Sequence, residues 1–244
     1  MAEVGGKIRL FVTADLAPGA EVRLDDAQAR YLFAVMRMAA GGRLLLFNGR
    51  DGEWSAEVVE AGRRGLLVVR APGKAQRRPP DLWLLFAPIK KARTDFIVEK
   101  ATELGVARIQ PVFTRLTAAE RLRADRLRAH AIEAAEQCGE TYVPELAEPA
   151  RLGELLDGWD PARRLMFCDE ERSAPPAIDA LRSASRGPWA VLIGPEGGFA
   201  PEEALRLRGL PYVTAVTLGP RVLRADTAAA AALALWQATL GDWR

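Results

Sequence analysis

The feature that most constrains the fold of this chain is a change in hydrophobic pattern around residues 71–80. Before this stretch, short apolar runs are separated by turn signals; from residue 82 onward, apolar strands alternate with helical segments. Strand–helix repetition predicts a mostly parallel sheet covered on both faces. Residues 71–80 mix Pro, Gly and basic residues with no apolar period, which is typical of a linker. We therefore expect a first domain over 1–72, a basic linker over 73–80 and a second domain over 81–244.

The first domain is expected to be a small β-barrel or curled sheet with one helix. Apolar residues at helical spacing cover 27–38, behind Asp25 and Asp26 as candidate N-terminal caps. The sequence Asn-Gly-Arg-Asp-Gly at 48–52 predicts a hairpin turn. Short strands are predicted at 9–12, 22–24, 44–47, 54–59 and 66–69.

The second domain is expected to be an α/β sheet domain. Its predicted strands are 82–86, 108–112, 165–168, 189–193 and 213–218, and its predicted helices are 94–104, 118–138, 177–181, 201–207 and 225–240. In open sheets of this kind, ligands bind at the carboxyl ends of the strands.

The scarcity of histidine and cysteine excludes several classes of site. With only His130, Cys138 and Cys168, the chain cannot assemble a Cys/His zinc cluster, and a Ser-His-Asp triad would have to use His130. Two cysteines also argue against a disulfide framework, so we expect a reducing, cytoplasmic environment and no metal. The longest apolar run, 228–236, is too short for a membrane span, which needs roughly 20 residues.

The net charge is only +2, but it is unevenly distributed. Residues 63–93 contain nine Lys and Arg residues and one acid, Asp81. Such a basic segment attracts polyanions, although a solvated connector kept soluble by its charge has the same composition.

Two loops after successive predicted strands share an unusual form. The strand ending at residue 193 runs into GPEGGF at 194–199, and the strand ending at 218 runs into GPRVLR at 219–224. Glycine lets the backbone approach a ligand closely, and proline stiffens the turn. Strand-to-helix turns often contain both residues, but their recurrence favours a ligand site. The loops lack the GxxxxGK(S/T) and GxGxxG spacings, which excludes a triphosphate cradle and a dinucleotide fingerprint.

Several of these segments resemble one bacterial family. GPEGGF at 194–199, LGPRVLRADTA at 218–228, FIVEKATELGV at 96–106 and AAEQCG at 134–139 are similar to the RsmE-type methyltransferases of the SPOUT class, which modify a uridine at N3 in 16S ribosomal RNA. A weaker match is FAVMRMAAGGRLLLFNG at 33–49. The resemblance runs in order over nearly the whole chain.

The resemblance implies a PUA-like RNA-binding barrel followed by a SPOUT α/β domain with a C-terminal trefoil knot. It implies S-adenosylmethionine as cofactor, a homodimer through the knotted domain, and 16S ribosomal RNA or the small ribosomal subunit as partner. The residues expected to bind the cofactor are Phe167, Ile193, Gly194, Pro195, Glu196, Gly197, Gly198, Leu218, Gly219, Val222, Leu223 and Arg224.

The chain departs from the family pattern at four places. Arg30-Tyr31 stand where the family usually has a His, Glu140 replaces a common Arg, and Asp226 replaces the more usual Glu. Arg115 lies in a turn that fits the family poorly. These departures concern the expected RNA contacts more than the expected cofactor site.

Methylation at N3 requires in-line positioning and removal of the imino proton of uracil. The expected catalytic residues are Glu196, Arg221 and Arg224. Glu196 or Asp226 would accept the proton, or the two arginines would stabilise the uracil anion. Each acid also fits a helix-capping role, and each arginine also fits loop scaffolding through backbone carbonyls.

The expected RNA-binding residues lie in both domains. Lys90, Lys91 and Arg93 follow the first strand of the second domain and suit phosphate contacts, while a solvated charge run is the alternative. The weaker candidates in the first domain are Arg9, Arg37 and Arg43.

Two competing functions remain open at this point. One is a catalytically silent ribosome-assembly protein that binds RNA without transferring a methyl group. The other is a nucleotide-binding oxidoreductase, which the absent GxGxxG spacing disfavours.

Overall fold

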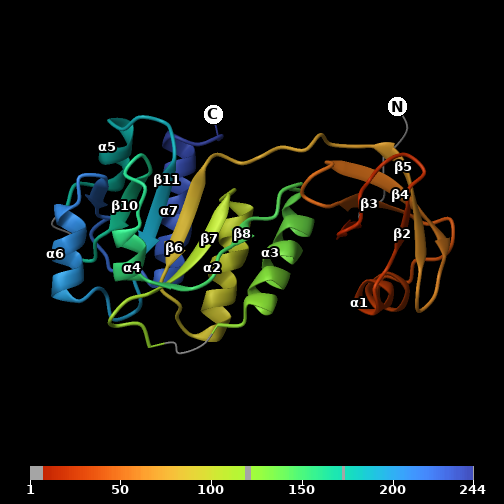
Figure 1. Cartoon of the computed structure of the whole chain (residues 1–244), viewed down its shortest axis with the longest axis horizontal. Helices are drawn as coiled ribbons and strands as arrows, with labels where there is room; N and C mark the ends of the chain where they lie inside the picture. Colours follow the sequence, from red (N-terminus) through yellow and green to blue (C-terminus); the bar gives the residue numbers. More distant parts are fainter. Residues whose placement is uncertain (1–7, 119–121, 172–173, 244) are drawn as a thin grey trace. The chain divides into compact units, whose positions relative to one another are not determined.

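The computed structural model describes residues 8–118, 122–171 and 174–243. The chain divides into two compact units (Figure 1). The N-terminal unit comprises Met1–Arg78 and Ala135–Val143, and the α/β unit comprises Pro79–Ala134 and Pro144–Arg244. Residues 135–143, expected in the second domain, belong to the N-terminal unit by their contacts.

The described residues of the N-terminal unit form a five-stranded sheet in the order β1-β3-β4-β5-β2. The β1–β3 pair is parallel and the other pairs are antiparallel. The hairpin predicted at residues 48–52 is confirmed, because β3 and β4 pair from Phe47 opposite Glu53. The strands are β1 (Arg9–Phe11), β2 (Glu21–Arg23), β3 (Arg43–Phe47), β4 (Glu53–Glu60) and β5 (Leu66–Pro72).

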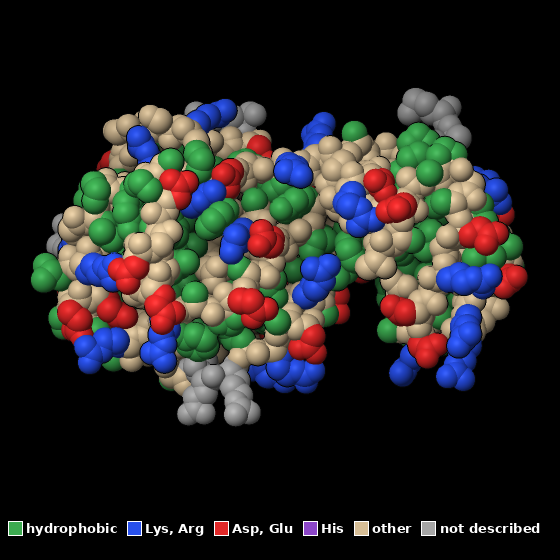
Figure 2. Space-filling model, in the orientation of Figure 1, with side chains coloured by type: hydrophobic (Ala, Val, Ile, Leu, Met, Phe, Trp, Pro, Cys, Tyr) green, Lys and Arg blue, Asp and Glu red, His purple; other side chains and the backbone are tan. Residues whose placement is uncertain are grey.

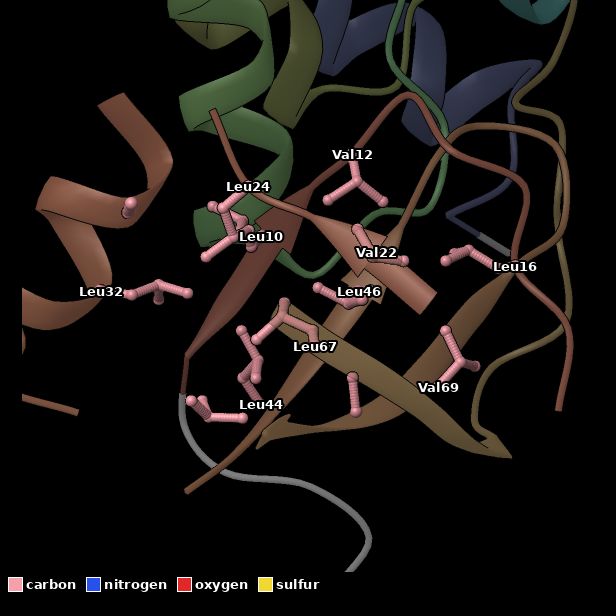
Figure 3. Packing of buried hydrophobic residues seen from close by; sticks show 13 residues of the cluster. Leu10, Val12, Leu16, Val22, Leu24, Leu32, Leu44, Leu46, Leu67 and Val69 are labelled. Carbon is pink, nitrogen blue, oxygen red and sulfur yellow. The ribbon is translucent and has the colours of Figure 1, made fainter. Parts of the chain in front are cut away.

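Alternation along these strands builds the core of the unit. Leu44 and Leu46 of β3 and Leu67 of β5 are fully buried, and Leu32 of the helical segment packs into the same cluster (Figure 3). The β4–β5 register shifts at Ser55/Ala56 and at Val58/Glu60, and irregularities of this kind generally increase the local twist of a sheet. Burial of each such leucine contributes roughly 1.5–3 kcal/mol.

A helix forms over most of the predicted range 27–38, but it is shorter than expected and most of it is a π-helix. A four-residue helix α1 (Asp26–Ala29) continues into a π-helical turn η1 (Arg30–Val35). Asp25 caps α1: its carboxylate accepts from the Gln28 N–H at 2.8 Å, while the Gln28 side chain accepts from the Asp25 N–H at 3.1 Å. The helix stops before Met38 because Arg37 adopts a left-handed backbone conformation, with φ 54°.

The described part of the α/β unit forms a seven-stranded sheet, with order β12-β10-β11-β6-β7-β8 and β9 pairing with β7. Every pair is parallel, as the strand–helix repetition predicts. The strands are β6 (Leu82–Phe86), β7 (Arg108–Phe113), β8 (Glu145–Leu146), β9 (Ala150–Arg151), β10 (Arg164–Cys168), β11 (Trp189–Ile193) and β12 (Val213–Val216). The helices are α2 (Lys91–Glu103), α3 (Ala124–Cys138), α4 (Leu152–Asp157), α5 (Ala177–Arg182), α6 (Pro201–Gly209) and α7 (Ala225–Thr239). The last residues of α3, from Ala135 onward, belong to the N-terminal unit.

β8, β9 and α4 were not predicted, because they are too short to show a hydrophobic period. The long helix was predicted to begin at residue 118, whereas α3 begins at Ala124; residues 119–121, inside the predicted range, lie outside the described residues.

Helices cover both faces of the parallel sheet (Figure 1). Leu156 of α4 and Leu207 of α6 share one cluster with Leu192 of β11. The alternate residue of that strand, Val191, is also fully buried, and α7 lies against β11 with α2 and α5 packed beside it. Within the described residues, no helix combines the length and apolar character needed to cross a bilayer.

Candidate functional site

A pocket of about 490 Å³ lies at the carboxyl ends of β10, β11 and β12. Because β10 lies between the other two strands, the two Gly-Pro loops are not on adjacent strands; they flank the end of β10. Phe167 was the one residue predicted from β10; Cys168, Asp169 and Glu170 were not predicted, because the loop after β10 has no Gly-Pro signal. The lining residues are Cys168, Asp169, Glu170, Ile193, Gly194, Pro195, Glu196, Gly197, Gly198, Thr217, Leu218, Gly219, Arg221, Val222, Leu223, Arg224, Ala225 and Ala228.

The first Gly-Pro loop, residues 194–199, needs glycine at two positions for steric reasons. A Cβ on Gly194 would lie 2.5 Å from the ring of Phe199. Gly198 has φ +73°, and a Cβ there would collide with the carboxylate of Glu170. The loop therefore packs tightly against its own Phe199 ring and against Glu170.

The loop after β10 anchors this first loop. Glu170 accepts a hydrogen bond from the Phe199 N–H at 2.7 Å. The neighbouring Asp169 is buried and accepts from Arg208 of α6 at 2.8 Å. These carboxylates hold the pocket wall, and the carboxylate of Asp169 is already paired.

The second Gly-Pro loop is more open. Thr217 Oγ1 donates to the Gly219 carbonyl oxygen at 3.2 Å, which fixes the start of the loop. Val222 is 73% exposed, although it is a large apolar residue that lines the pocket. Ala225 and Ala228 of α7 complete the wall, and their small side chains leave room for a ligand.

The predicted catalytic residues all line the pocket: Glu196, Arg221 and Arg224. Glu196 is 46% exposed and pairs with Arg93, whose Nη1 lies 3.1 Å from Glu196 Oε1. The alternative acid, Asp226, is not among the lining residues; its carboxylate accepts from the Thr227 N–H at 2.8 Å in the first turn of α7. Of the two predicted acids, only Glu196 lines the pocket, whereas Asp226 bonds a backbone N–H in the first turn of α7.

One predicted cofactor residue, Phe167, does not line the pocket. Its side chain is fully buried and packs edge-on against Phe199, with ring centroids 5.1 Å apart. Phe167 therefore supports the first loop from beneath, because the residues of β10 that reach the pocket follow it. All the other predicted cofactor residues line the pocket.

Cys168 contributes a thiol to the pocket wall. Burial raises the pKa of this thiol to about 12, because the thiolate loses its hydration there. Cys168 is thus a neutral, unreactive wall residue at physiological pH.

Arg9, a predicted RNA contact, is engaged inside the N-terminal unit. Its Nε lies 2.7 Å from Glu53, and its other nitrogens donate to the carbonyl oxygens of Ala135, Glu136 and Glu140. The guanidinium also lies over the Phe47 ring, 4.5 Å from its centroid. These contacts hold residues 135–143 in the unit, so Arg9 has a structural role here.

The other predicted RNA contacts differ from Arg9 in exposure. Arg37 and Arg43 of the N-terminal unit are exposed, as are Lys90 and Lys91 at the start of α2. Arg93, by contrast, is half-buried and paired with acids. Of the three residues 90, 91 and 93, only the two lysines present their charges freely to solvent.

The segment around η1 exposes an apolar face that was not predicted from the sequence. Tyr31, Val35 and Met36 are 38%, 62% and 43% exposed, and they lie within one turn because the Met36 N–H donates to the Tyr31 carbonyl oxygen. Arg30 and Arg37 flank them in sequence. Lys and Arg side chains also gather at the edge of this unit below α1 in Figure 2. We call residues 30–37 the η1 face.

The part of the chain that the structure describes contains no cluster of side chains arranged as metal ligands. Among residues 8–118, 122–171 and 174–243, no group of three or more His, Cys, Asp or Glu side chains is arranged to hold a metal ion.

Two family models match the chain in the order of its two units. The model of the RNA methyltransferase domain matches residues 76–237, and that of the RNA methyltransferase PUA domain matches residues 24–69. The chain is 30% identical to the ribosomal RNA small subunit methyltransferase E of Rickettsia conorii, over 93% of both chains.

Solved structures with the same architecture include two with a bound cofactor. A methyltransferase from Legionella pneumophila in complex with S-adenosylmethionine is 30% identical, with a TM-score of 0.88 over 96% of this chain and 98% of that one. Ribosomal RNA small subunit methyltransferase E from Neisseria gonorrhoeae, also bound to S-adenosylmethionine, is 27% identical, with a TM-score of 0.85 over 97% and 99%.

Proposed function

Because this chain belongs to the RNA methyltransferase family, in the group of the ribosomal RNA small subunit methyltransferases E, we propose that it transfers a methyl group from S-adenosylmethionine to N3 of a uridine in 16S ribosomal RNA. The observation that carries the proposal is the pocket where the two Gly-Pro loops flank the end of β10. Two structural relatives have S-adenosylmethionine bound.

The pocket fits a cofactor of this size and chemistry. Its volume of about 490 Å³ lies within the range of small-molecule sites, roughly 300–1,000 Å³. Glycine backbone from both loops can approach the cofactor closely, while Leu218 and Leu223 provide apolar surface for its base. S-adenosylmethionine supplies an activated methyl group, so the chain has to provide positioning and charge.

The charged residues of the pocket then have separate tasks. Arg221 and Arg224 are exposed on the second Gly-Pro loop, where they can hold the uracil oxygens and stabilise negative charge as the N3 proton leaves. Glu196 lines the pocket and is 46% exposed, so its carboxylate can accept this proton. The target base has to leave its stack to reach these groups.

The RNA contacts are proposed from exposure and charge. Lys90 and Lys91 suit phosphate contacts in the α/β unit, and Arg37 and Arg43 suit them in the N-terminal unit. The η1 face adds Tyr31, an exposed aromatic ring on which an unpaired base can stack. Arg9 is not proposed as an RNA contact, because its N–H donors are engaged within the N-terminal unit.

Three further properties follow from the family resemblance and remain proposals. The loops that flank β10 belong to a C-terminal trefoil knot, and the knotted domain forms a homodimer. Small residues on α7, including Ala228 and Ala231, are only partly buried and allow close approach of a partner helix. A ribosomal RNA substrate places the enzyme in the cytoplasm.

The decisive experiment is methyl transfer from labelled S-adenosylmethionine to small ribosomal subunits, with the modified nucleoside identified by mass spectrometry. We expect N3-methyluridine. A different methylated nucleoside would refute the assigned position, and no transfer together with no binding of S-adenosylhomocysteine at millimolar concentration would refute the cofactor assignment.

A catalytically silent RNA-binding protein is the alternative, and one variant separates it from the enzyme. Arg224→Ala is expected to abolish turnover while the fold is retained, because Arg224 is exposed. Salt-dependent binding to small subunits without any methyl incorporation by the wild type would support the silent protein instead.

A further inference from the structure

Arg93 of α2 lies between two acids, Glu196 of the pocket wall and Asp226 of α7, which is not a lining residue. Its Nη1 is 3.1 Å from Glu196 Oε1 in the first Gly-Pro loop. Its Nε is 3.8 Å from Asp226 Oδ2, in the first turn of α7 directly after the second Gly-Pro loop. One guanidinium therefore connects the two segments that carry the pocket residues on either side of β10.

The backbone that carries Arg93 is firmly held. The neighbouring Thr94 is buried, and its hydroxyl bonds both the N–H and the carbonyl oxygen of Ile89, at 3.1 and 3.0 Å. The next residue, Asp95, is buried and paired with Arg126 of α3. Arg93 thus projects from a rigid helix start, whereas Glu196 lies on a loop.

From this arrangement we infer that Arg93 is a positioning residue of the cofactor pocket, and the inference rests on the proposed function. By pairing with Glu196 and Asp226 it sets the separation of the two Gly-Pro loops and orients the Glu196 carboxylate. Removal of the guanidinium leaves the like charges of Glu196 and Asp226 uncompensated, and their repulsion moves the first Gly-Pro loop away from the start of α7. Arg93 was predicted from the sequence to contact RNA phosphates, and its pairing with two acids favours the positioning role.

Lysine can replace only part of this function. The two acids are met by two different nitrogens of the planar guanidinium, Nη1 and Nε. A lysine ammonium is a single point of charge. It can pair closely with one of the two carboxylates, but it cannot pair closely with both at the same time. Arg93→Lys should therefore be intermediate between the wild type and Arg93→Ala.

The test compares Arg93→Ala and Arg93→Lys with Arg128→Ala, which removes one exposed arginine from α3. Binding of S-adenosylhomocysteine is measured by calorimetry, methyl transfer by steady-state kinetics and small-subunit affinity by filter binding. We expect Arg93→Ala to raise the cofactor Kd about tenfold, in line with ~1.4 kcal/mol, and to lower kcat. Small-subunit affinity should stay within twofold of wild type, Arg93→Lys should recover part of both losses, and Arg128→Ala should match wild type.

Two results would overturn the inference. Unchanged cofactor binding with weakened small-subunit affinity in Arg93→Ala would make Arg93 an RNA contact, and unchanged binding and turnover would give it no role. If Arg93→Ala does not fold, wild-type kinetics and cofactor affinity in the lysine variant would likewise refute the dual pairing. A wild-type protein that does not bind the cofactor would refute the proposed function itself, so the two failures are distinguishable.

Discussion

Gly198→Ala tests whether close packing against the Glu170 carboxylate fixes the position of the first Gly-Pro loop. Gly198 combines a left-handed backbone, φ +73°, with close approach of the Glu170 carboxylate. The substitution introduces a Cβ that has to displace this carboxylate. Displacement breaks the 2.7 Å hydrogen bond from the Phe199 N–H to Glu170.

The expected loss of stability has two parts. A left-handed conformation at a residue with a Cβ costs roughly 1–2 kcal/mol. Loss of a hydrogen bond to a charged group adds roughly 1.5–3 kcal/mol. Together these give about 2.5–5 kcal/mol, and the first loop should move away from the cofactor.

Gly19→Ala is the matched control, because Gly19 has φ +79° and no atom lies within 4 Å of the position that a Cβ would take there. It should show the backbone cost of roughly 1–2 kcal/mol alone and leave cofactor affinity unchanged. Denaturant unfolding gives the stabilities, and calorimetry with S-adenosylhomocysteine gives the affinities, for which we expect at least a tenfold loss in Gly198→Ala. Equal destabilisation of the two variants with equal cofactor affinity would refute the steric argument.

Three further predictions concern other parts of the molecule. Since the pKa of the Cys168 thiol is raised to about 12, its thiolate is scarce below that pH; iodoacetamide at pH 8 should label exposed Cys138 first, and rapid labelling of Cys168, read by peptide mass spectrometry, would contradict this. Tyr31→Ala should weaken small-subunit binding about 5- to 150-fold, as expected from roughly 1–3 kcal/mol per stacked base, whereas Leu205→Ala on α6 should not; equal affinities by filter binding would remove the η1 face from the interface. Asp25→Ala should destabilise the N-terminal unit by about 1 kcal/mol in denaturant unfolding, and no change would mean that the capping box contributes nothing.

Local patterns were sufficient where a residue's neighbours in sequence set its conformation. The alternation after residue 82 predicted the parallel sheet, and the Asn-Gly turn predicted the β3–β4 hairpin, because each is encoded in a few consecutive residues. The Gly-Pro loops likewise marked two of the three strand ends that form the pocket.

Roles that depend on distant partners could not be obtained in this way. Arg9 and Arg93 were both predicted to bind RNA, yet Arg9 is engaged by the Ala135 carbonyl, 126 residues away, and Arg93 by Glu196, 103 residues along the chain. A basic side chain carries the same charge whether it faces solvent or a buried acid. Only the folded chain decides whether that side chain is free to bind RNA or is paired within the protein.

The amino-acid sequence by itself determined the longer strands and helices and the rigid turns, since spacing and backbone preference act over a few residues. The tertiary structure alone decided the strand order that inserts β10 between the two Gly-Pro loops and so brings Asp169 and Glu170 to the pocket. That order depends on packing between segments far apart in the chain, for which a single sequence contains no local signal.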